Sequence, residues 1–130
     1  MLSVCVLSGA TAWAELPPYV YEERQHAAPE ALTIKVISAK ISHNETREAV
    51  IRGVVAKAEI ISVEHSATSL KRGSTITIAY TTTEYKTPRP GPSEPAILRE
   101  GTQSPAYLQK DEKTGNYTPA AGGWSFSPKR

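Results

Sequence analysis

The stretch "STITIAYTTT", residues 74–83, alternates strictly between two kinds of side chain. Ile76, Ile78 and Tyr80 stand at every second position, and threonines and one alanine occupy the positions between them. Successive side chains of a β-strand point to opposite faces, so this alternation predicts a strand with one buried and one solvated face. The β-branched residues also favour extended backbone. The stretch therefore indicates a sheet protein whose core lies against one face of each strand.

Two longer apolar segments precede this strand, and each changes its alternation part-way along. They are residues 31–42, "ALTIKVISAKIS", and residues 49–66, "AVIRGVVAKAEIISVEHS". In the first, the inward phase changes between Val36 and Ile37, so that Ile37 begins a new inward-facing set. In the second, the phase changes after Ile60. One extra residue in a strand, a β-bulge, exchanges the two faces in this way, so both segments are predicted strands with bulges.

A helix is the alternative for residues 49–66, because Ala, Lys and Glu favour helices. The Val and Ile content and the turn that follows favour a strand instead. Within it, Gly53 predicts a sharp bend or a close approach of backbone, since glycine has no side chain to obstruct one.

The remaining segments predict turns and short strands. Residues 86–95, "KTPRPGPSEP", form a rigid loop, because four prolines remove the donors that a central strand needs. Residues 96–101 and 105–112 are predicted as two short strands around a turn at Gly101. Another turn is expected at residues 113–117.

The sum of these elements is an all-β protein with five or six strands and little helix. Bulges and glycine kinks let a small sheet coil and close, so we expect a small antiparallel barrel of the OB type, with a β-sandwich as the alternative. We assign residues 31–130 to a single β domain. Residues 15–30 form a lead-in segment, within which residues 19–28 are predicted to make one or two helical turns.

The start of the chain predicts an export signal. Residues 2–12 are uncharged and apolar, and the small-x-small triplet Ala12-Trp13-Ala14 follows them. This pattern is typical of a secretory signal peptide, here residues 1–14, and it predicts a periplasmic or secreted protein. The alternatives are a buried N-terminal strand or helix, and a lipid anchor at Cys5. After cleavage the chain would contain no cysteine, so its core would be stabilised without disulfides.

Charge and composition argue against two kinds of partner. The net charge is +2, and the fifteen basic residues are scattered among thirteen acidic ones without any basic run. Proteins that bind nucleic acid or anionic membranes concentrate such residues, so we expect no nucleic-acid partner. No second apolar segment is long enough to predict a membrane span.

Catalytic and metal-binding motifs are also missing from the sequence. The histidines, His26, His43 and His65, do not have the spacing of a zinc site, and no G-x-S-x-G motif is present. We therefore expect no metal, no cofactor and no enzymatic activity. The alternative is a small exported hydrolase whose groups converge only in space, with His43 or His65 as the base.

The functional prediction is an exported, non-catalytic binding module for a protein or a surface ligand. Rigid exposed loops on a sheet scaffold often bind partners. The predicted contact surface is therefore the proline loop with its preceding aromatic residue, namely Tyr85, Arg89 and Pro90.

The central part of the chain resembles a netrin-like OB barrel, the module of tissue inhibitors of metalloproteinases. The resemblance runs from residues 54–80, "VVAKAEIISVEHSATSLKRGSTITIAY", to residues 95–117, "PAILREGTQSPAYLQKDEKTGNY". It consists of a long strand, an L-x-x-G turn, a β-branched strand, a proline-bearing loop and a glycine-led strand. That family is held by disulfides, and its inhibitors use an N-terminal cysteine to reach the target's zinc. Because residues 15–130 contain no cysteine, the resemblance implies the fold alone.

The signal-peptide assignment makes a direct prediction about the mature protein. We expect mass spectrometry of protein recovered from the envelope or the medium to find Glu15 as the first residue. Met1 intact on protein retained in the cytosol would contradict it.

Overall fold

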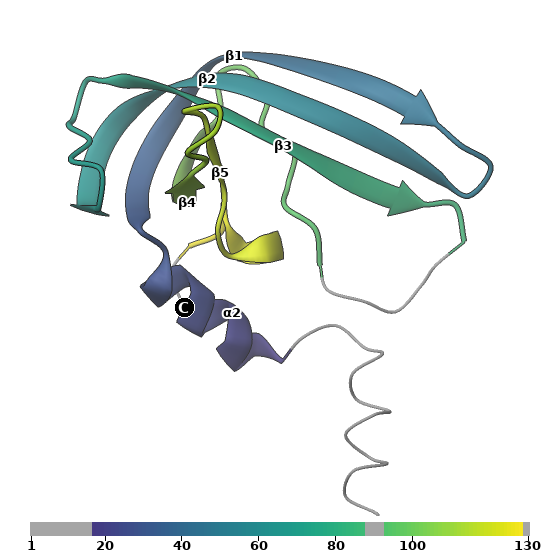
Figure 1. Ribbon diagram of the computed structural model, residues 1–130, viewed down its shortest axis with the longest axis horizontal. Coiled ribbons are helices and arrows are strands. Elements are labelled where there is room, and N and C mark those ends of the chain that lie inside the picture. The colour runs from purple at the N-terminus through teal and green to yellow at the C-terminus, as the bar shows by residue number, and fades with distance from the viewer. Residues whose placement is uncertain (1–16, 88–92, 129–130) are drawn as a thin grey trace, which may run out of the picture.

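The computed structural model describes residues 17–87 and 93–128, and within them it places one α-helix, five strands and one 3-10 turn (Figure 1). In chain order these are α2 (Pro18–Ala27), β1 (Glu30–Glu45), β2 (Ala49–Ser66), β3 (Thr75–Tyr85), β4 (Gln103–Lys110), β5 (Tyr117–Pro119) and η1 (Gly122–Trp124). The signal-peptide prediction, residues 1–14, lies outside the described residues.

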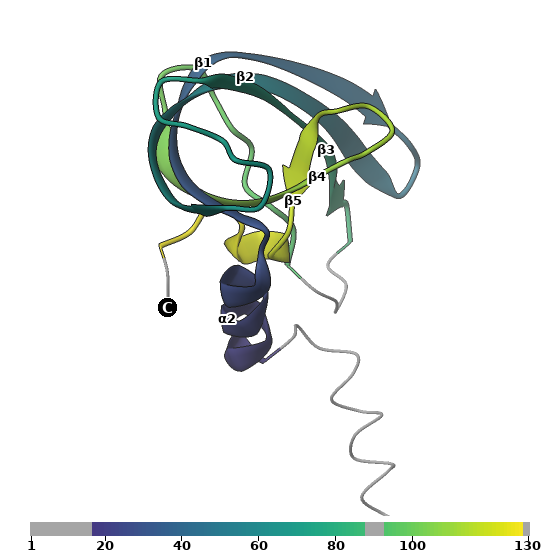
Figure 2. The ribbon, with the colours of Figure 1, turned by 60° about the vertical axis from the view of Figure 1, so that its left-hand side comes forward.

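The five strands close into a barrel in the order β1-β2-β3-β5-β4, and Figure 2 looks into the ring that they form. This confirms the predicted all-β, OB-like barrel over the alternative sandwich. One expectation needs correction, because the barrel is mixed rather than wholly antiparallel. β3 and β5 run parallel and meet at the pair Ile78 and Tyr117. A closed ring with an odd number of strands cannot alternate direction all the way round, so five strands require at least one parallel pair.

The core fills the barrel with one face of each strand. Ile34, Ile60 and Ile78 come from three neighbouring strands, and each is completely buried. The two faces predicted for residues 74–83 are confirmed, since the isoleucines of β3 face inward and its threonines alternate with them. The buried core residues are Leu32, Ile34, Val36, Val54, Ala56, Ala58, Ile60, Ile76, Ile78, Leu98, Ala106, Leu108 and Tyr117.

Both predicted bulges are present in the pairing of β1 with β2. On β1, Val36 and Ser38 pair with consecutive residues of β2, so Ile37 is the extra residue. Its side chain is 47% exposed, which corrects the expectation that Ile37 begins the second inward-facing set. Ala39 and Ile41, the next members of that set, do pack against the core.

On β2 the register shifts twice, and the extra residues are Ile61 and Glu64. The first lies where the sequence places the change of phase, directly after Ile60. Bulges increase local twist and bend a strand, and these lie where β1 and β2 curve into the barrel. The strand prediction for residues 49–66 is confirmed over its helical alternative.

Beyond the barrel, three strands continue as a projecting sheet, which we call the arm. It consists of residues 38–45, 49–57 and 77–85, and Figure 1 shows it extending to the right of the barrel. β4 pairs with β1 only as far as Lys35, so from residue 38 onward β1 is paired with β2 alone among the described residues.

One predicted strand is absent. Residues 96–101 have no strand among them and end in a turn, where Gly101 has φ +86°. The hydroxyl of Tyr80 explains the difference, because it donates to the carbonyl of Ala96 (2.6 Å) and accepts from the amide of Leu98 (3.0 Å). A side chain thus satisfies backbone groups that a strand would pair. The next strand, β4, starts at Gln103 rather than 105.

The helix α2 lies under one end of the barrel and packs against η1, near the other end of the described chain (Figure 1). The ring of Tyr21 stacks on that of Trp124, with centroids 5.1 Å apart. The buried amide of Gln25 donates to the carbonyl of Trp124 at 2.9 Å. The helical turns predicted for residues 19–28 are therefore real, and η1 fixes them in place.

Two isoleucines of β1 test this register directly. We expect Ile34→Ala to reduce the free energy of unfolding by about 2–5 kcal/mol, because it leaves a cavity in the closed core. Ile37→Ala, at the exposed bulge, should change it by no more than about 0.5 kcal/mol. Urea denaturation of both variants provides the measurement, and equal losses would contradict the bulge at residue 37.

Candidate functional site

The predicted contact surface is only partly placed by the structure. Tyr85 is the last residue of β3 and lies at the tip of the arm, opposite Ala49, with 48% of its surface exposed. Arg89 and Pro90 lie outside the described residues. The structure therefore puts one of the three predicted residues at an exposed end of the sheet and leaves the other two untested.

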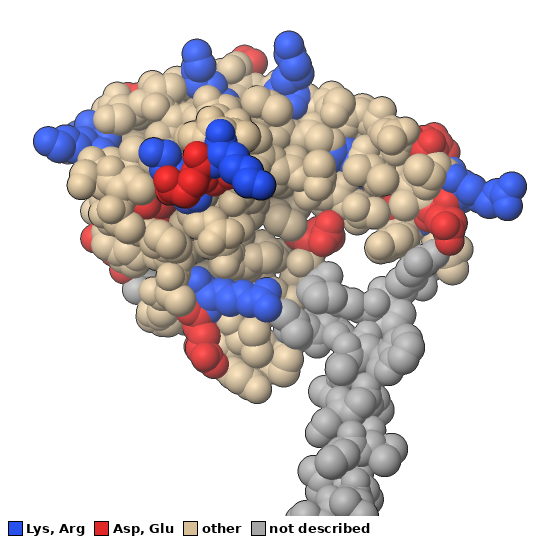
Figure 3. Space-filling model, in the orientation of Figure 1, with Lys and Arg blue, Asp and Glu red and all other residues tan. Residues whose placement is uncertain are grey.

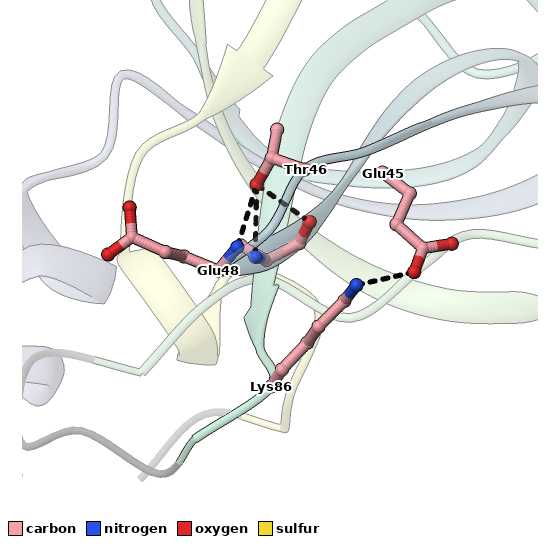
Figure 4. Close-up of polar contacts among 5 residues, drawn as sticks. Glu45, Thr46, Glu48 and Lys86 are labelled. Carbon is pink, nitrogen blue, oxygen red and sulfur yellow. Dashed lines mark hydrogen bonds and ion pairs between the residues drawn. The ribbon is translucent and has the colours of Figure 1, made fainter.

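The tip of the arm is fixed by its own polar contacts (Figure 4). The hydroxyl of Thr46 accepts from the amides of Ala49 (3.0 Å) and Glu48 (3.3 Å), which closes the turn between β1 and β2. The ammonium of Lys86 lies 2.5 Å from a carboxylate oxygen of Glu45, and this ion pair ties the end of β3 to the end of β1. The tip is therefore a braced hairpin rather than a loose loop.

This ion pair changes the protonation of one group. The hydrogen bond and the positive charge of Lys86 lower the pKa of Glu45 below its ordinary value of 4.5. The pair is exposed, so salt screens it. Its contribution to stability is complete above about pH 4.5 and is lost as the pH falls through the lowered pKa of the folded state.

The concave side of the arm is occupied by the chain that follows β3. The carboxylate of Glu94 accepts from the amide of Thr83 at 2.9 Å, and the hydroxyl of Tyr80 binds the same segment. Burial raises the pKa of Tyr80, so its hydroxyl stays protonated and remains a donor. Arg52 and Glu84 form a further ion pair at 2.9 Å. The contacts of Glu94 and Tyr80 join the loop to β3, whereas the ion pair joins β2 to β3.

The convex side of the arm carries two adjoining hollows, of about 490 and 370 Å³, which we call the outer groove. Both hollows are lined by Lys40 and Val55. The larger one lies beside Ser42, Gly53 and Ala79, none of which has a large side chain to fill the space. The remaining lining residues are Ser38, Ala39, Ser42, Val54, Lys57, Thr77, Tyr80 and Thr81.

The outer groove combines an apolar floor with a basic and hydroxyl-rich rim. Val55 is 50% exposed, although it lies in the middle of a strand. Lys40 and Lys57 flank it, and no carboxylate is among the described lining residues. In Figure 3, basic side chains stand out from the convex side of the sheet, at the top of the view. Such a surface can take an anionic ligand with some apolar contact.

Gly53 is explained by its close approach to β1. A Cβ at this position would lie 2.7 Å from the hydroxyl oxygen of Ser42, so the absence of a side chain lets that serine lie over β2. The atom that approaches Gly53 closely is thus a side-chain oxygen, and no backbone atom of the described residues, its chain neighbours aside, lies within 4 Å of that Cβ position.

The histidines proposed as alternative bases lie at opposite ends of β1 and β2. His43 pairs with Arg52 on the arm, whereas His65 pairs with Ala31 in the barrel. Nε2 of His65 lies 2.8 Å from the carbonyl of Ala28. A carbonyl oxygen can only accept, so this nitrogen carries the proton and is not available as a base. The two rings do not converge on one site.

A buried polar cluster lies at one end of the barrel. The carboxylate of Glu30 is fully buried and accepts from the hydroxyl of Ser66, and from the amide (3.2 Å) and hydroxyl (3.1 Å) of Thr68. The hydroxyl of Tyr117 lies 2.8 Å from that of Thr68. Because the carboxylate has no solvent access and its oxygens are bonded, this cluster fixes the loop after β2 and does not form a site.

Among residues 17–87 and 93–128, no group of three or more His, Cys, Asp or Glu side chains is arranged to hold a metal ion. No helix in the described ranges has the length and apolar character needed to cross a membrane.

Comparisons with protein-family models, with curated proteins and with solved structures give no match to this chain. The assignment of an OB-like barrel therefore rests on its own strand order and closure.

The outer groove was not predicted from the sequence, although part of its signal was visible. Lys57 and Val55 alternate with the buried alanines of β2, which places them on the outer face of that strand. The position of Lys40 beside Val55 depends on the register of β1 against β2, and the bulge at Ile37 sets that register.

The ion pair at the arm tip predicts a measurable change in one carboxyl group. In Lys86→Gln, we expect the pKa of Glu45 to rise towards its ordinary value, because the donor and the positive charge are both lost. NMR titration of the Glu45 side-chain carbonyl measures this. Lys113→Gln removes the same charge from a distant turn and should leave Glu45 unchanged, whereas an unchanged pKa in Lys86→Gln would contradict the pairing.

Proposed function

We propose that this protein is an exported, non-catalytic binding module that takes its ligand on the arm, chiefly in the outer groove. The observation that carries the proposal is the groove itself, in which exposed Val55 lies between Lys40 and Lys57. Export is supported by the signal-like pattern of residues 1–14.

The chemistry of the groove suits binding. Exposed apolar side chains on a sheet give up hydration when a ligand covers them. The hydroxyls of Ser38, Ser42 and Thr81 add donors and acceptors, and the lysines supply charge. Sites with an apolar floor and a few placed polar groups are typical of ligand-binding surfaces.

The fold supports the same location by analogy. OB barrels commonly bind ligands on the face made by their second and third strands. In this chain Val55 and Lys57 of β2, with Thr77 and Ala79 of β3, contribute to that face. Tyr85 continues β3 to the tip, so it remains in the proposed contact surface together with Arg89.

The resemblance to netrin-like domains agrees with this proposal at the level of fold. A closed five-stranded barrel is compatible with that module. We propose no inhibition of metalloproteinases, because residues 15–130 offer no cysteine to reach a zinc ion.

A panel of defined probes tests the proposed function. Amide NMR spectra of the protein would be recorded with acidic, basic and neutral peptides, a polyuronate oligosaccharide and single-stranded DNA. We expect the acidic peptide or the polyuronate, and not the DNA, to shift the amides of Lys40, Val55 and Ala79, and we expect Lys40→Glu with Lys57→Glu to weaken that probe at least tenfold. The same change of charge at Lys71 and Lys113, in exposed turns, is the matched control and should leave affinity unchanged.

Two outcomes would overturn the proposal. One is that no probe shifts the groove amides. The other is turnover in a broad hydrolase screen that His43→Ala or His65→Ala abolishes, which would support the enzymatic alternative instead.

A further inference from the structure

The two edge strands of the arm, β3 and β1, differ in whether other parts of the chain cover their outer edge. On β3, the amide of Thr83 donates to Glu94, and Tyr80 holds the same loop through the carbonyl of Ala96. That edge is therefore covered. On the opposite side of the arm, the last backbone bonds of β1 join Val36 to Thr102 and Gly101.

From residue 38 to residue 45, β1 has an open edge. Within the described part of the chain, no strand pairs with it on the side away from β2. The bulge at Ile37 explains why, because the strand leaves β4 at that point and continues into the arm. An open edge presents unpaired N–H and C=O groups on alternate residues, which is a template for another strand. Eight residues give an edge about 26 Å long.

The side chains along this edge differ on its two faces. Ser38, Lys40 and Ser42 face the outer groove, whereas Ala39 and Ile41 lie on the other face, partly buried and packed against the core. A strand added here would therefore place alternate side chains beside Lys40 and beside Ile41. The side chains beside Lys40 would lie in a basic environment, and those beside Ile41 would lie in an apolar environment.

Charge complementarity selects the partner. Lys40 and Lys57 form no ion pair with any described residue, and both are exposed. Glu45, at the end of the same edge, is already neutralised by Lys86. An unpaired lysine on an edge strand also opposes self-association, because two copies paired about this position would bring their lysines together.

We propose that the open edge of β1, residues 38–45, binds an extended acidic peptide by strand addition, with acidic side chains over Lys40 and apolar ones beside Ala39 and Ile41. This inference rests on the proposed function and names its ligand class. The alternating N–H and C=O groups of the edge match the spacing of donors and acceptors in a polypeptide backbone, which neither a polyuronate nor a phosphodiester chain reproduces.

A designed peptide of nine residues, alternating Val and Glu and carrying a fluorophore, is the probe. Fluorescence anisotropy at low salt would measure its affinity. We expect it to bind at least tenfold more tightly than the same peptide with Gln in place of Glu. Lys40→Glu should weaken it at least tenfold, and Lys71→Glu, an equal change of charge in an exposed turn, should not.

Two N-methylated versions of this peptide test strand addition itself. One carries methyl groups on the Val amides and the other on the Glu amides, so only one of them loses the donors that face β1. We expect one version to lose binding at least tenfold and the other to keep it. A side-chain interaction alone would leave the two equally strong, and that result would overturn the inference.

The remaining outcomes separate this inference from the proposed function. If the polyuronate binds the groove and the peptide does not, the binding module stands and the peptide inference fails. If neither binds and no other probe does, both fail. If the protein forms a dimer in sedimentation experiments, dimerisation protects the amides of residues 38–45 from exchange, and the peptide does not bind, a second copy occupies the edge and the inference is overturned.

Discussion

The structure depends on the burial of one face of three neighbouring strands, β1, β2 and β3. Ile34, Ile60 and Ile78, one from each strand, are completely buried. The chain has no cysteine after residue 14, so beyond that point burial does the stabilising without disulfides. Fully burying one such side chain contributes about 1.5–3 kcal/mol. The bulges follow from this requirement, because they let long strands curve into a barrel and still keep an apolar face inward on the arm.

The same requirement produces the outer groove. On the inward face, the small residues Ala56 and Ala58 belong to the same core cluster as the buried isoleucines of β1, β2 and β3. On the outer face, the missing side chain of Gly53 makes room for Ser42, and the single methyl group of Ala79 leaves the hollow beside it. A strand that packs against the core with one face can thus carry a groove on the other.

Much of the fold could be predicted from the sequence, because period-two alternation reports directly on burial. It located β1, β2 and β3 and two of the three bulges, and it missed the one at Glu64. It failed at residues 96–101, where the hydroxyl of Tyr80 replaces a strand partner, since a contact between residues so far apart leaves no local pattern. It also failed to find the outer groove, because the alignment of Lys40 with Val55 exists only once two strands are in register. Of the predicted contact residues, Tyr85 is exposed at the arm tip, which does not test its role.

The odd number of strands leaves the barrel with a seam. β3 and β5 are joined by a single parallel pair, and β5 is only three residues long, whereas every other junction is an antiparallel ladder. Local unfolding should begin at that seam. The pairing of β5 with β3 would break, while β4 stays paired with β1. The arm would stay intact in such an opened form, so a ligand held there would neither drive the opening nor be released by it.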